Sequence, residues 1–335
     1  PRMKHSNPRL PLLTMEPYYR TVVWGGEAIF AFKGEEARGS AIGESWEVSD
    51  LEGCESLVSA DGKEFAGTLL SELCRDHAEA LLGRRLLNVR MTRFPLLIKI
   101  IDAEKELSIQ VHPDDYMAYR RHGTSGKTEM WYTLSAADDA CIYSGLQRSV
   151  TPEALREHIA NGSVMSLLAK FRPVPGDYFY LPAGRIHSLG HSMVLEIQQP
   201  SDITYRIFDY NRPGLDGKPR SLHIDEALEA TDFRVHEDYR RHREPIPGRE
   251  QVLQECPHFI ATVVNFDNAP VSIAVGRYTS PRVLVATAGE GRVTDDLGNT
   301  VHLRRGHTVI VPATTPEVTL IPDTNDFEVV TAYIP

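Results

Sequence analysis

Gln110 and His112 are potential metal ligands that stand two residues apart in a run of mostly apolar residues. Successive side chains of a strand point to opposite faces, so residues two apart share a face and can reach the same ion. Glu129 follows at the start of the next expected strand. An amide oxygen, an imidazole and a carboxylate on neighbouring strands predict a site for a divalent cation.

A fourth ligand is expected from the segment Gly176-Asp-Tyr-Phe-Tyr-Leu-Pro182-Ala-Gly184-Arg-Ile-His187. Its first glycine suits a turn that leads into a strand, and Pro182 with Gly184 suits a bend that returns His187 toward the interior. A single histidine is more often a surface or hydrogen-bonded residue than a ligand, and the chain has 13. The ordered set favours one Zn²⁺ ion per chain, with room for substrate oxygens.

A second copy of this segment runs from Gly306 to Glu317, with Pro312 and Thr314 in the places of Pro182 and Gly184. The first copy brings a histidine to the expected interior, and the second brings Glu317. We therefore expect two related β-barrels, of which only the first is equipped for metal.

The elements that must position these residues are mostly short strands bounded by Gly and Pro. We expect strands at 94–101, 107–112, 129–134, 177–181 and 193–198, and over most of 259–334. Helices are expected at 64–82, at 113–122, at 224–230 and after Thr151, which precedes Pro152 at the first helical position.

Helices are concentrated before residue 235, and a polar, Pro-containing stretch at 236–250 separates them from the strand-only remainder. We predict an N-terminal tail at 1–15, a catalytic domain with helical insertions at 16–250, and a smaller β domain at 251–335.

Composition narrows the class of protein. The net charge of −10 is spread along the chain with no basic stripe, so nucleic acid is not an expected partner. Apolar runs fall well short of the roughly 18 residues that span a bilayer, so no membrane segment is expected. Four separated cysteines without a Cys-x-x-Cys pair favour a reduced, cytoplasmic protein.

The spacing Gly-x5-Pro-x-Gly-x-x-His from Gly176 to His187 resembles the second motif of the cupin superfamily. This resemblance implies a mainly β fold with inserted helices, built from two cupin-type (jelly-roll) β-barrel domains, the second without metal. In cupins the other ligands come from an earlier pair of strands, where Gln110, His112 and Glu129 lie.

Further blocks resemble type I mannose-6-phosphate isomerases, in the short bacterial form. They cover most of residues 18–233 in order, and they include Trp24-Gly-Gly26, Gly43-Glu-Ser-Trp46-Glu-Val-Ser49, Phe94-Pro-Leu-Leu-Ile-Lys99, Leu107-Ser-Ile-Gln-Val-His-Pro-Asp114, Gly126-Lys-Thr-Glu-Met-Trp131 and Thr204-Tyr-Arg206-Ile-Phe-Asp-Tyr-Asn-Arg212. The resemblance implies interconversion of mannose 6-phosphate and fructose 6-phosphate by zinc-assisted proton transfer between C1 and C2, through an enediol-type intermediate.

The resemblance also implies roles for single residues. The family binds zinc at the positions of Gln110, His112, Glu129 and His187, and the position of Arg206 is an essential active-site arginine. Positions matching Lys99, Ser108, Lys127 and Glu196 lie in or beside the active site. We expect Glu196, Lys127 and Arg206 to be catalytic, and Lys99, Ser108, Lys127 and Arg206 to bind substrate, with Arg185 a further cation for the phosphate.

Alternatives remain at this stage. Glu196 has two possible roles, as a proton carrier or as a carboxylate that orients a ligand histidine. The catalytic base is unassigned. A metal-dependent cupin oxidase or dioxygenase is a second function, although such enzymes often have His where Gln110 stands. A non-enzymatic sugar-binding cupin is a third. We expect a small-molecule sugar phosphate as partner, and a monomer or a homodimer.

Overall fold

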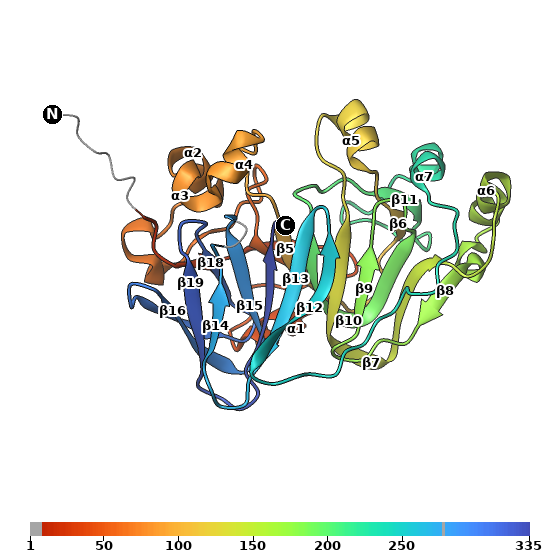
Figure 1. Ribbon diagram of the computed structural model, residues 1–335. Coiled ribbons are helices and arrows are strands. Elements are labelled where there is room, and N and C mark those ends of the chain that lie inside the picture. Colours follow the sequence, from red (N-terminus) through yellow and green to blue (C-terminus); the bar gives the residue numbers. More distant parts are fainter. Residues whose placement is uncertain (1–8, 277–278) are drawn as a thin grey trace.

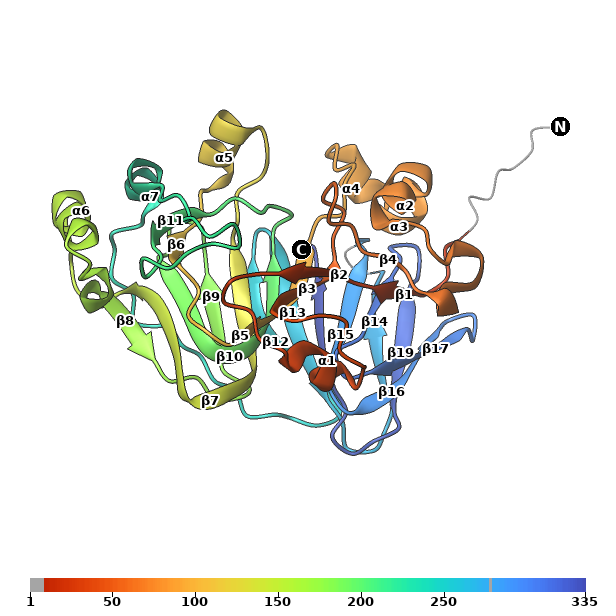
Figure 2. The ribbon, with the colours of Figure 1, turned by 180° about the vertical axis from the view of Figure 1, so that it is seen from behind.

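The computed structural model of the chain describes residues 9–276 and 279–335, and Figure 1 shows two sheet-built halves side by side. The chain is mainly β, as expected from the sequence. Helices α5–α7 lie above one half and α2–α4 above the other (Figure 1). The strands of each half lie beneath these helices, and the view from behind shows α1 (Ala28–Lys33) low on the molecule, away from the other helices (Figure 2).

The first half is a nine-stranded sheet in the order β11-β6-β10-β5-β3-β2, with β7 pairing β10, β8 and β9. Its strands are β2 (Tyr18–Thr21), β3 (Ile42–Val48), β5 (Leu97–Ala103), β6 (Ile109–Val111), β7 (Glu129–Leu146), β8 (Leu168–Phe171), β9 (Tyr178–Leu181), β10 (His187–Gln198) and β11 (Tyr205–Phe208). Every residue of β5 is buried, because it lies between β10 and β3 and packs on both faces.

The second half combines a seven-stranded and a four-stranded sheet. The first has β12 (Arg249–Cys256), β13 (Phe259–Asn265), β20 (Glu328–Tyr333), β15 (Arg282–Ala288), β18 (Thr308–Val311), β1 (Leu13–Glu16) and β4 (Leu57–Val58). The second has β14 (Val271–Ala274), β19 (Glu317–Pro322), β16 (Glu290–Asp295) and β17 (Thr300–Arg304). The strand-rich character expected after residue 250 is confirmed for the described residues.

The helices are short. They are α1 (Ala28–Lys33), η1 (Ala60–Phe65), α2 (Leu70–Asp76), α3 (Ala78–Leu82), α4 (Arg84–Asn88), α5 (Asp115–His122), α6 (Pro152–Ala160), η2 (Val164–Leu167) and α7 (Ile224–Ala230). The helix after Thr151 is confirmed, and the Thr151 hydroxyl accepts from the Ala154 amide. Helix α5 begins two residues later than expected, because Asp114 caps it by accepting from the Met117 amide.

The prediction of one helix at 64–82 was wrong. Gly67 has a φ of 80°, which takes the chain out of the helical region, and Leu69 is extended. The chain forms η1, then α2, and breaks again at His77 before α3. Apolar residues at helical spacing are therefore shared among three short elements that cover the second half (Figure 1).

The prediction of an N-terminal tail at 1–15 was wrong for residues 9–15. Residues 1–8 lie outside the described residues. Leu10, Leu12 and Leu13 are at most 3% exposed. Strand β1 pairs with β18 on one side and with β4 on the other, so this segment is part of the seven-stranded sheet. Four residues are enough for β1 because the sheet supplies partners for both edges of the strand.

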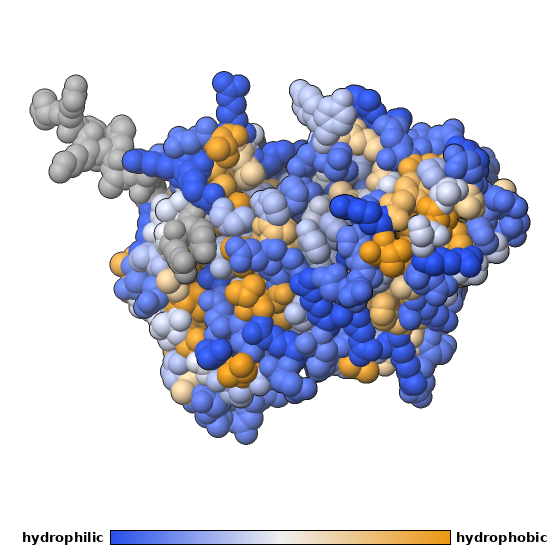
Figure 3. Space-filling model, turned by 45° about the vertical axis from the view of Figure 1, so that its right-hand side comes forward, coloured by the Kyte–Doolittle hydropathy of each residue, from blue (hydrophilic) through white to orange (hydrophobic). Residues whose placement is uncertain are grey.

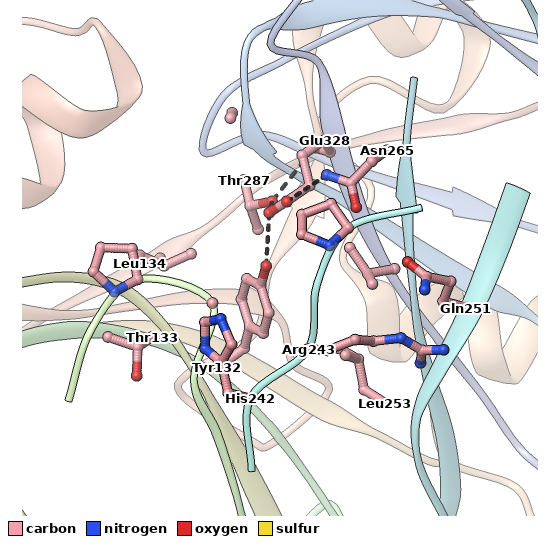
Figure 4. A pocket seen from close by; sticks show the side chains of 15 residues that line it. Tyr132, Thr133, Leu134, His242, Arg243, Gln251, Leu253, Asn265, Thr287 and Glu328 are labelled. Carbon is pink, nitrogen blue, oxygen red and sulfur yellow. Dashed lines mark hydrogen bonds between the residues drawn. The ribbon is translucent and has the colours of Figure 1, made fainter. Parts of the chain in front are cut away.

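Polar contacts and a shared core join the two halves. In Figure 4, Tyr132 from β7 points to Glu328 of β20, and its hydroxyl donates to Glu328 Oε1 at 2.9 Å. Thr287 and Asn265 also donate to this carboxylate, at 2.6 and 2.7 Å. A cavity of about 370 Å³ lies beside this contact. One apolar cluster contains residues of both halves, such as Ile98 and Phe259.

The surface is polar for the most part. On the face shown in Figure 3, hydrophilic residues predominate and hydrophobic residues form small separate patches. None of the helices in the described part of the chain is both long and apolar enough to cross a membrane.

Candidate metal centre and active site

The four predicted ligands converge at one end of the first half. Gln110 lies in β6, His112 directly follows it, and Glu129 and His187 are the first residues of β7 and β10. His187 pairs with Gln110 across the sheet, which places their side chains on one face. Nε2 of His187 lies 3.1 Å from Glu129 Oε1, and Nε2 of His112 lies 3.5 Å from Glu129 Oε2.

The backbone fixes which nitrogen of each histidine faces this point. Nδ1 of His112 is 2.9 Å from the Ile203 carbonyl, and Nδ1 of His187 is 2.8 Å from the Arg185 carbonyl. A carbonyl only accepts, so each Nδ1 donates, and each Nε2 is the ring nitrogen left to face the site. Two Nε2 atoms and a carboxylate therefore face one another, with potential ligand atoms of all three residues within 4.8 Å. This donor set fits a divalent cation.

Glu129 is fully buried, and its oxygens accept no regular hydrogen bond from any described residue. The Lys127 ammonium lies 2.8 Å from Oε2, in an ion pair. Burial raises the pKa of Glu129, but Lys127 and then His112 lower it more, so the pKa lies well below its ordinary value. Glu129 is therefore a carboxylate, which is the form that binds metal.

His112 and Lys127 differ in charge. Burial, and then the neighbouring Lys127, lowers the pKa of His112 to about 3. Burial also lowers the pKa of Lys127, but Glu129 and Glu196 reverse this and raise it above its ordinary value. Near neutral pH His112 is thus a neutral imidazole, the form that binds metal. The positively charged Lys127 Nζ lies 3.2 Å from Nε2 of His112.

The Gln110 amide bridges Ser108 and His187. Ser108 Oγ donates to its Oε1 at 3.1 Å, and its Nε2 lies 3.4 Å from His187 Nε2. The oxygen and nitrogen of a side-chain amide can exchange places, and the Ser108 hydroxyl can accept as well as donate. The Gln110 oxygen can therefore serve as a ligand without loss of the bond to Ser108.

A cavity of about 200 Å³ opens beside these ligands. Six residues singled out from the sequence line it: Lys99, Ser108, Gln110, Lys127, Glu196 and Arg206. They come from different strands and loops of the first half. Such a concave polar site has the character expected for a small charged substrate.

Glu196 lies in β10, opposite Lys99 of β5 and Trp131 of β7. The Trp131 indole donates to Oε2 at 2.7 Å, and Lys99 Nζ lies 3.5 Å from Oε1. Burial, and then Glu129, raises the pKa of Glu196 above its ordinary value, although Lys127 and Lys99 oppose this. A carboxyl with a raised pKa is suited to proton transfer near neutral pH.

Lys99 lies in the fully buried strand β5, where an aromatic ring and carboxylates, instead of water, surround its ammonium group. Its ammonium is 4.4 Å from the centre of the Trp46 ring and 3.8 Å from Asp202 Oδ1. A buried cation requires such compensation, which explains why a lysine is tolerated in an apolar strand.

Arg206 in β11 brings a third cation to the cavity. Its Nη1 donates to the Ser221 carbonyl at 2.8 Å, and its buried Nε has no hydrogen-bond partner among the described residues. Burial lowers its pKa, and the nearby Arg220 adds to this. Asp209 forms ion pairs with both Arg212 and Arg220, so Arg206 is a third guanidinium group near one carboxylate. This end of the cavity has an excess of positive charge.

Some cavity residues had not been singled out. Asp202 lines the cavity and pairs with Arg20 at 3.0 Å, and Arg20 and Arg220 also line it. Burial raises the pKa of Asp202, but Lys99 and Arg20 lower it more. Asp202 stands just before the block that begins at Thr204 and could have been found beside it, whereas Arg20 and Arg220 carry no local signal.

Two expectations about single residues were wrong. Arg185 lies outside the cavity, where it donates to the Tyr180 carbonyl at 2.7 Å and stacks on Tyr239. Glu317 is exposed on β19 and does not face an interior. Both repeat copies bend through a turn closed by an equivalent backbone hydrogen bond, in which the amides of Arg185 and Thr315 donate to the carbonyls of Pro182 and Pro312.

Comparisons with known proteins place this arrangement in a family. Residues 12–137 match the model of the type I phosphomannose isomerase catalytic domain. Mannose-6-phosphate isomerase ManA of Bacillus subtilis is 35% identical over 286 residues, which cover 84% of this chain and 87% of the relative. The chain belongs to the type I mannose-6-phosphate isomerase family.

Other members support this membership over nearly the whole length. Mannose-6-phosphate isomerase of Streptococcus mutans is 36% identical, over 87% of this chain and 89% of the relative. The crystal structure of the Bacillus subtilis mannose 6-phosphate isomerase covers 96% of this chain and 99% of its own, with a TM-score of 0.80 and 28% identity. The family fold therefore extends beyond residue 137 to both halves.

Proposed function

We propose that the chain interconverts mannose 6-phosphate and fructose 6-phosphate, as the names of its relatives state for them. The observation that carries this proposal is the meeting of two imidazoles and a buried carboxylate beside a cavity lined by cations. An aldose–ketose isomerase needs an electrophile at the sugar oxygens, and a phosphorylated substrate needs positive charge.

Gln110, His112, Glu129 and His187 would hold one Zn²⁺ ion per chain. The donors are those that zinc accepts, and Glu129 has buried oxygens without regular hydrogen bonds from the described residues. The ion, when bound, would act as a Lewis acid toward the oxygens on C1 and C2 and make the adjacent C–H more acidic.

The chain's own groups would move the protons. Isomerisation removes a proton from one of C1 and C2 and returns it to the other, while the two oxygens exchange between carbonyl and hydroxyl. Glu196 has a raised pKa, and its buried Oε1 accepts no hydrogen bond from the described residues, so it is the proton carrier we favour. Lys127 would donate to the oxygen that becomes negative, and Arg206 would stabilise that charge.

Lys99, Ser108, Lys127 and Arg206 would bind the substrate. Arg206 and Arg220 stand at the end with excess positive charge, which supports placing the phosphate there. Ser108 lies next to the ligand Gln110, which supports a contact with the sugar.

For the architecture we propose two cupin-type jelly-roll units, the catalytic one within 16–250 and the smaller one within 251–335. Strands β1 and β4 add to the sheet of the smaller unit. Within the described residues 9–276 and 279–335, the group that could hold a metal ion is His112, Glu129 and His187, in the catalytic unit. We propose that the smaller unit is without metal. A cytoplasmic monomer or homodimer stays a prediction.

The proposal is tested on purified protein by metal analysis together with an assay of mannose 6-phosphate conversion under anaerobic conditions. We expect about one zinc per chain and isomerase activity that chelation removes. Arg206→Ala should keep its metal and lose turnover. Oxygen uptake with added iron would instead favour a cupin oxidase, and sugar binding without turnover would favour a non-enzymatic protein.

A further inference from the structure

The segment 126–128, which carries Lys127, has each of its three backbone amides hydrogen-bonded. The Gly126 amide donates to Asp115 Oδ1 at 2.8 Å, and the Lys127 amide donates to the Pro113 carbonyl at 3.1 Å. The Thr128 amide donates to Gln199 Oε1 at 2.9 Å. Three consecutive bonds of this kind outside a regular ladder leave the segment little freedom.

Gln199 contacts this segment through both its backbone and its side chain. The β7–β10 ladder ends at the pair Glu129–Gln198, one residue before it. The Gln199 amide donates to the Thr128 carbonyl at 3.1 Å, while its Oε1 accepts from the Thr128 amide. Its Nε2 donates to Asp115 Oδ1 at 2.9 Å, the same oxygen that accepts from Gly126. Gln199 is 6% exposed, so water competes little for these bonds.

The geometry allows little adjustment. A side chain on Gly126 would bring its Cβ within 2.6 Å of the Asp114 carbonyl carbon, so the segment lies directly against the start of α5. From this backbone Lys127 extends its ammonium to 2.8 Å from Glu129 and 3.2 Å from His112. A shift of the segment would move the ammonium relative to both groups.

We propose that Gln199, together with Asp115, is a positioning residue of the active site. It fixes the backbone that carries Lys127, and it acts through Lys127 without touching the substrate. The part that concerns catalysis rests on the proposed isomerase function.

Gln199→Ala tests this on the metal-loaded full chain. We expect kcat to fall about 10- to 100-fold, as for other partners that orient active-site groups. We expect KM to change by less than about threefold, because the loss falls on the reaction step. Zinc content should stay at the wild-type level, and the amides of 126–128 should exchange their hydrogens faster.

Two controls separate positioning from a loss of stability. Asp115→Asn keeps an oxygen that can accept from Gly126 and Gln199, so it should retain activity. Asp115→Ala removes that oxygen, so its kcat should fall by about as much as that of Gln199→Ala. Gln251→Ala is the matched glutamine. Gln251 is also buried, and its Oε1 accepts from the Ile246 amide at 2.9 Å, but it lies beside the cavity between the halves (Figure 4). It should lower stability and leave kcat unchanged.

Unchanged kcat in Gln199→Ala would overturn the proposal, as would equal losses in Asp115→Asn and Asp115→Ala. Loss of zinc in Gln199→Ala would assign the residue to the metal site instead. Hydrogen exchange is independent of activity: if the wild type were not an isomerase, unchanged exchange at 126–128 would still refute the positioning, and faster exchange would support it.

Discussion

Two buried ion pairs lie beside each other at the active site, Lys127 with Glu129 and Lys99 with Glu196. Charges buried this deeply are tolerated when they are paired. The pairs are unequal, because the first is at 2.8 Å and the second at 3.5 Å. Glu196 is therefore the less stabilised carboxylate, and it is the one in which a proton is most easily held.

Glu196→Gln tests this difference, because it keeps the shape and an oxygen for the Trp131 indole. We expect kcat to fall about 10²- to 10⁴-fold, the range for loss of a proton-transferring group, with zinc retained. Glu44→Gln is the matched control, since Glu44 accepts from the Trp46 indole at 2.6 Å in the same way. It should lose far less. Steady-state kinetics and metal analysis decide, and equal losses in both variants would remove Glu196 from proton transfer.

At the scale of elements, the turn between β9 and β10 leads into the ligand His187 and is hydrogen-bonded to the backbone of the ligand His112. Gly184 has a φ of 89°, and its amide donates to the His112 carbonyl at 2.9 Å. The second copy of the turn has Thr314 at this place, which is not among the described residues with positive φ and whose hydroxyl donates to the Ala80 carbonyl at 3.1 Å. The glycine thus serves the metal site, because only Gly adopts this φ without strain.

Gly184→Ala should disturb the fourth ligand. Its Cβ would lie 2.9 Å from the Ala230 carbonyl oxygen, so we expect a loss of about 1–2 kcal/mol from φ strain, more from the contact, and weaker zinc binding. Gly298→Ala is the control, because Gly298 has a φ of 85° with nothing within 4 Å of an added Cβ. Its free energy of unfolding should fall only by the part that comes from φ strain, and its zinc binding should not change. Urea unfolding and zinc titration measure the two effects, and unchanged zinc affinity in Gly184→Ala would contradict the prediction.

Over the whole molecule, the two halves depend on each other. Lys33 of α1 pairs with Glu47 of β3 at 2.6 Å and donates to the Gly306 carbonyl of the second half at 2.8 Å. Both side chains are 1% exposed. The chain also passes from β1 in the second half directly to β2 in the first, so we expect the halves to unfold together.

Lys33→Met would leave the Glu47 carboxylate buried without its partner. We expect the free energy of unfolding to fall by about 3–5 kcal/mol, in one transition for both halves. Arg156→Met removes an exposed pair with Asp225 and should cost less than about 1 kcal/mol. Urea unfolding followed by fluorescence gives both values. Separate transitions for the two halves would contradict the shared stability.

The predicted ligands and the strands that carry them came from local patterns. Alternation along a strand puts Gln110 and His112 on one face, and Gly184 sets the bend before His187. Both depend on backbone preferences of neighbouring residues, so one sequence is enough to predict them. The resemblance to a family supplied the roles of Arg206, Lys99 and Glu196.

Only the tertiary structure showed the bonds of Gln199 to Asp115, the place of Arg220 at the cavity, and the pairing of β1 with β18. Gln199 and Asp115 lie 84 residues apart in the sequence. The paired strands β1 and β18 are further apart still, since Leu13 pairs with Ile310. Local preferences say nothing about such pairs, because packing of the whole chain decides which distant groups meet. A four-residue segment such as β1 is a strand only because the folded sheet provides its neighbours.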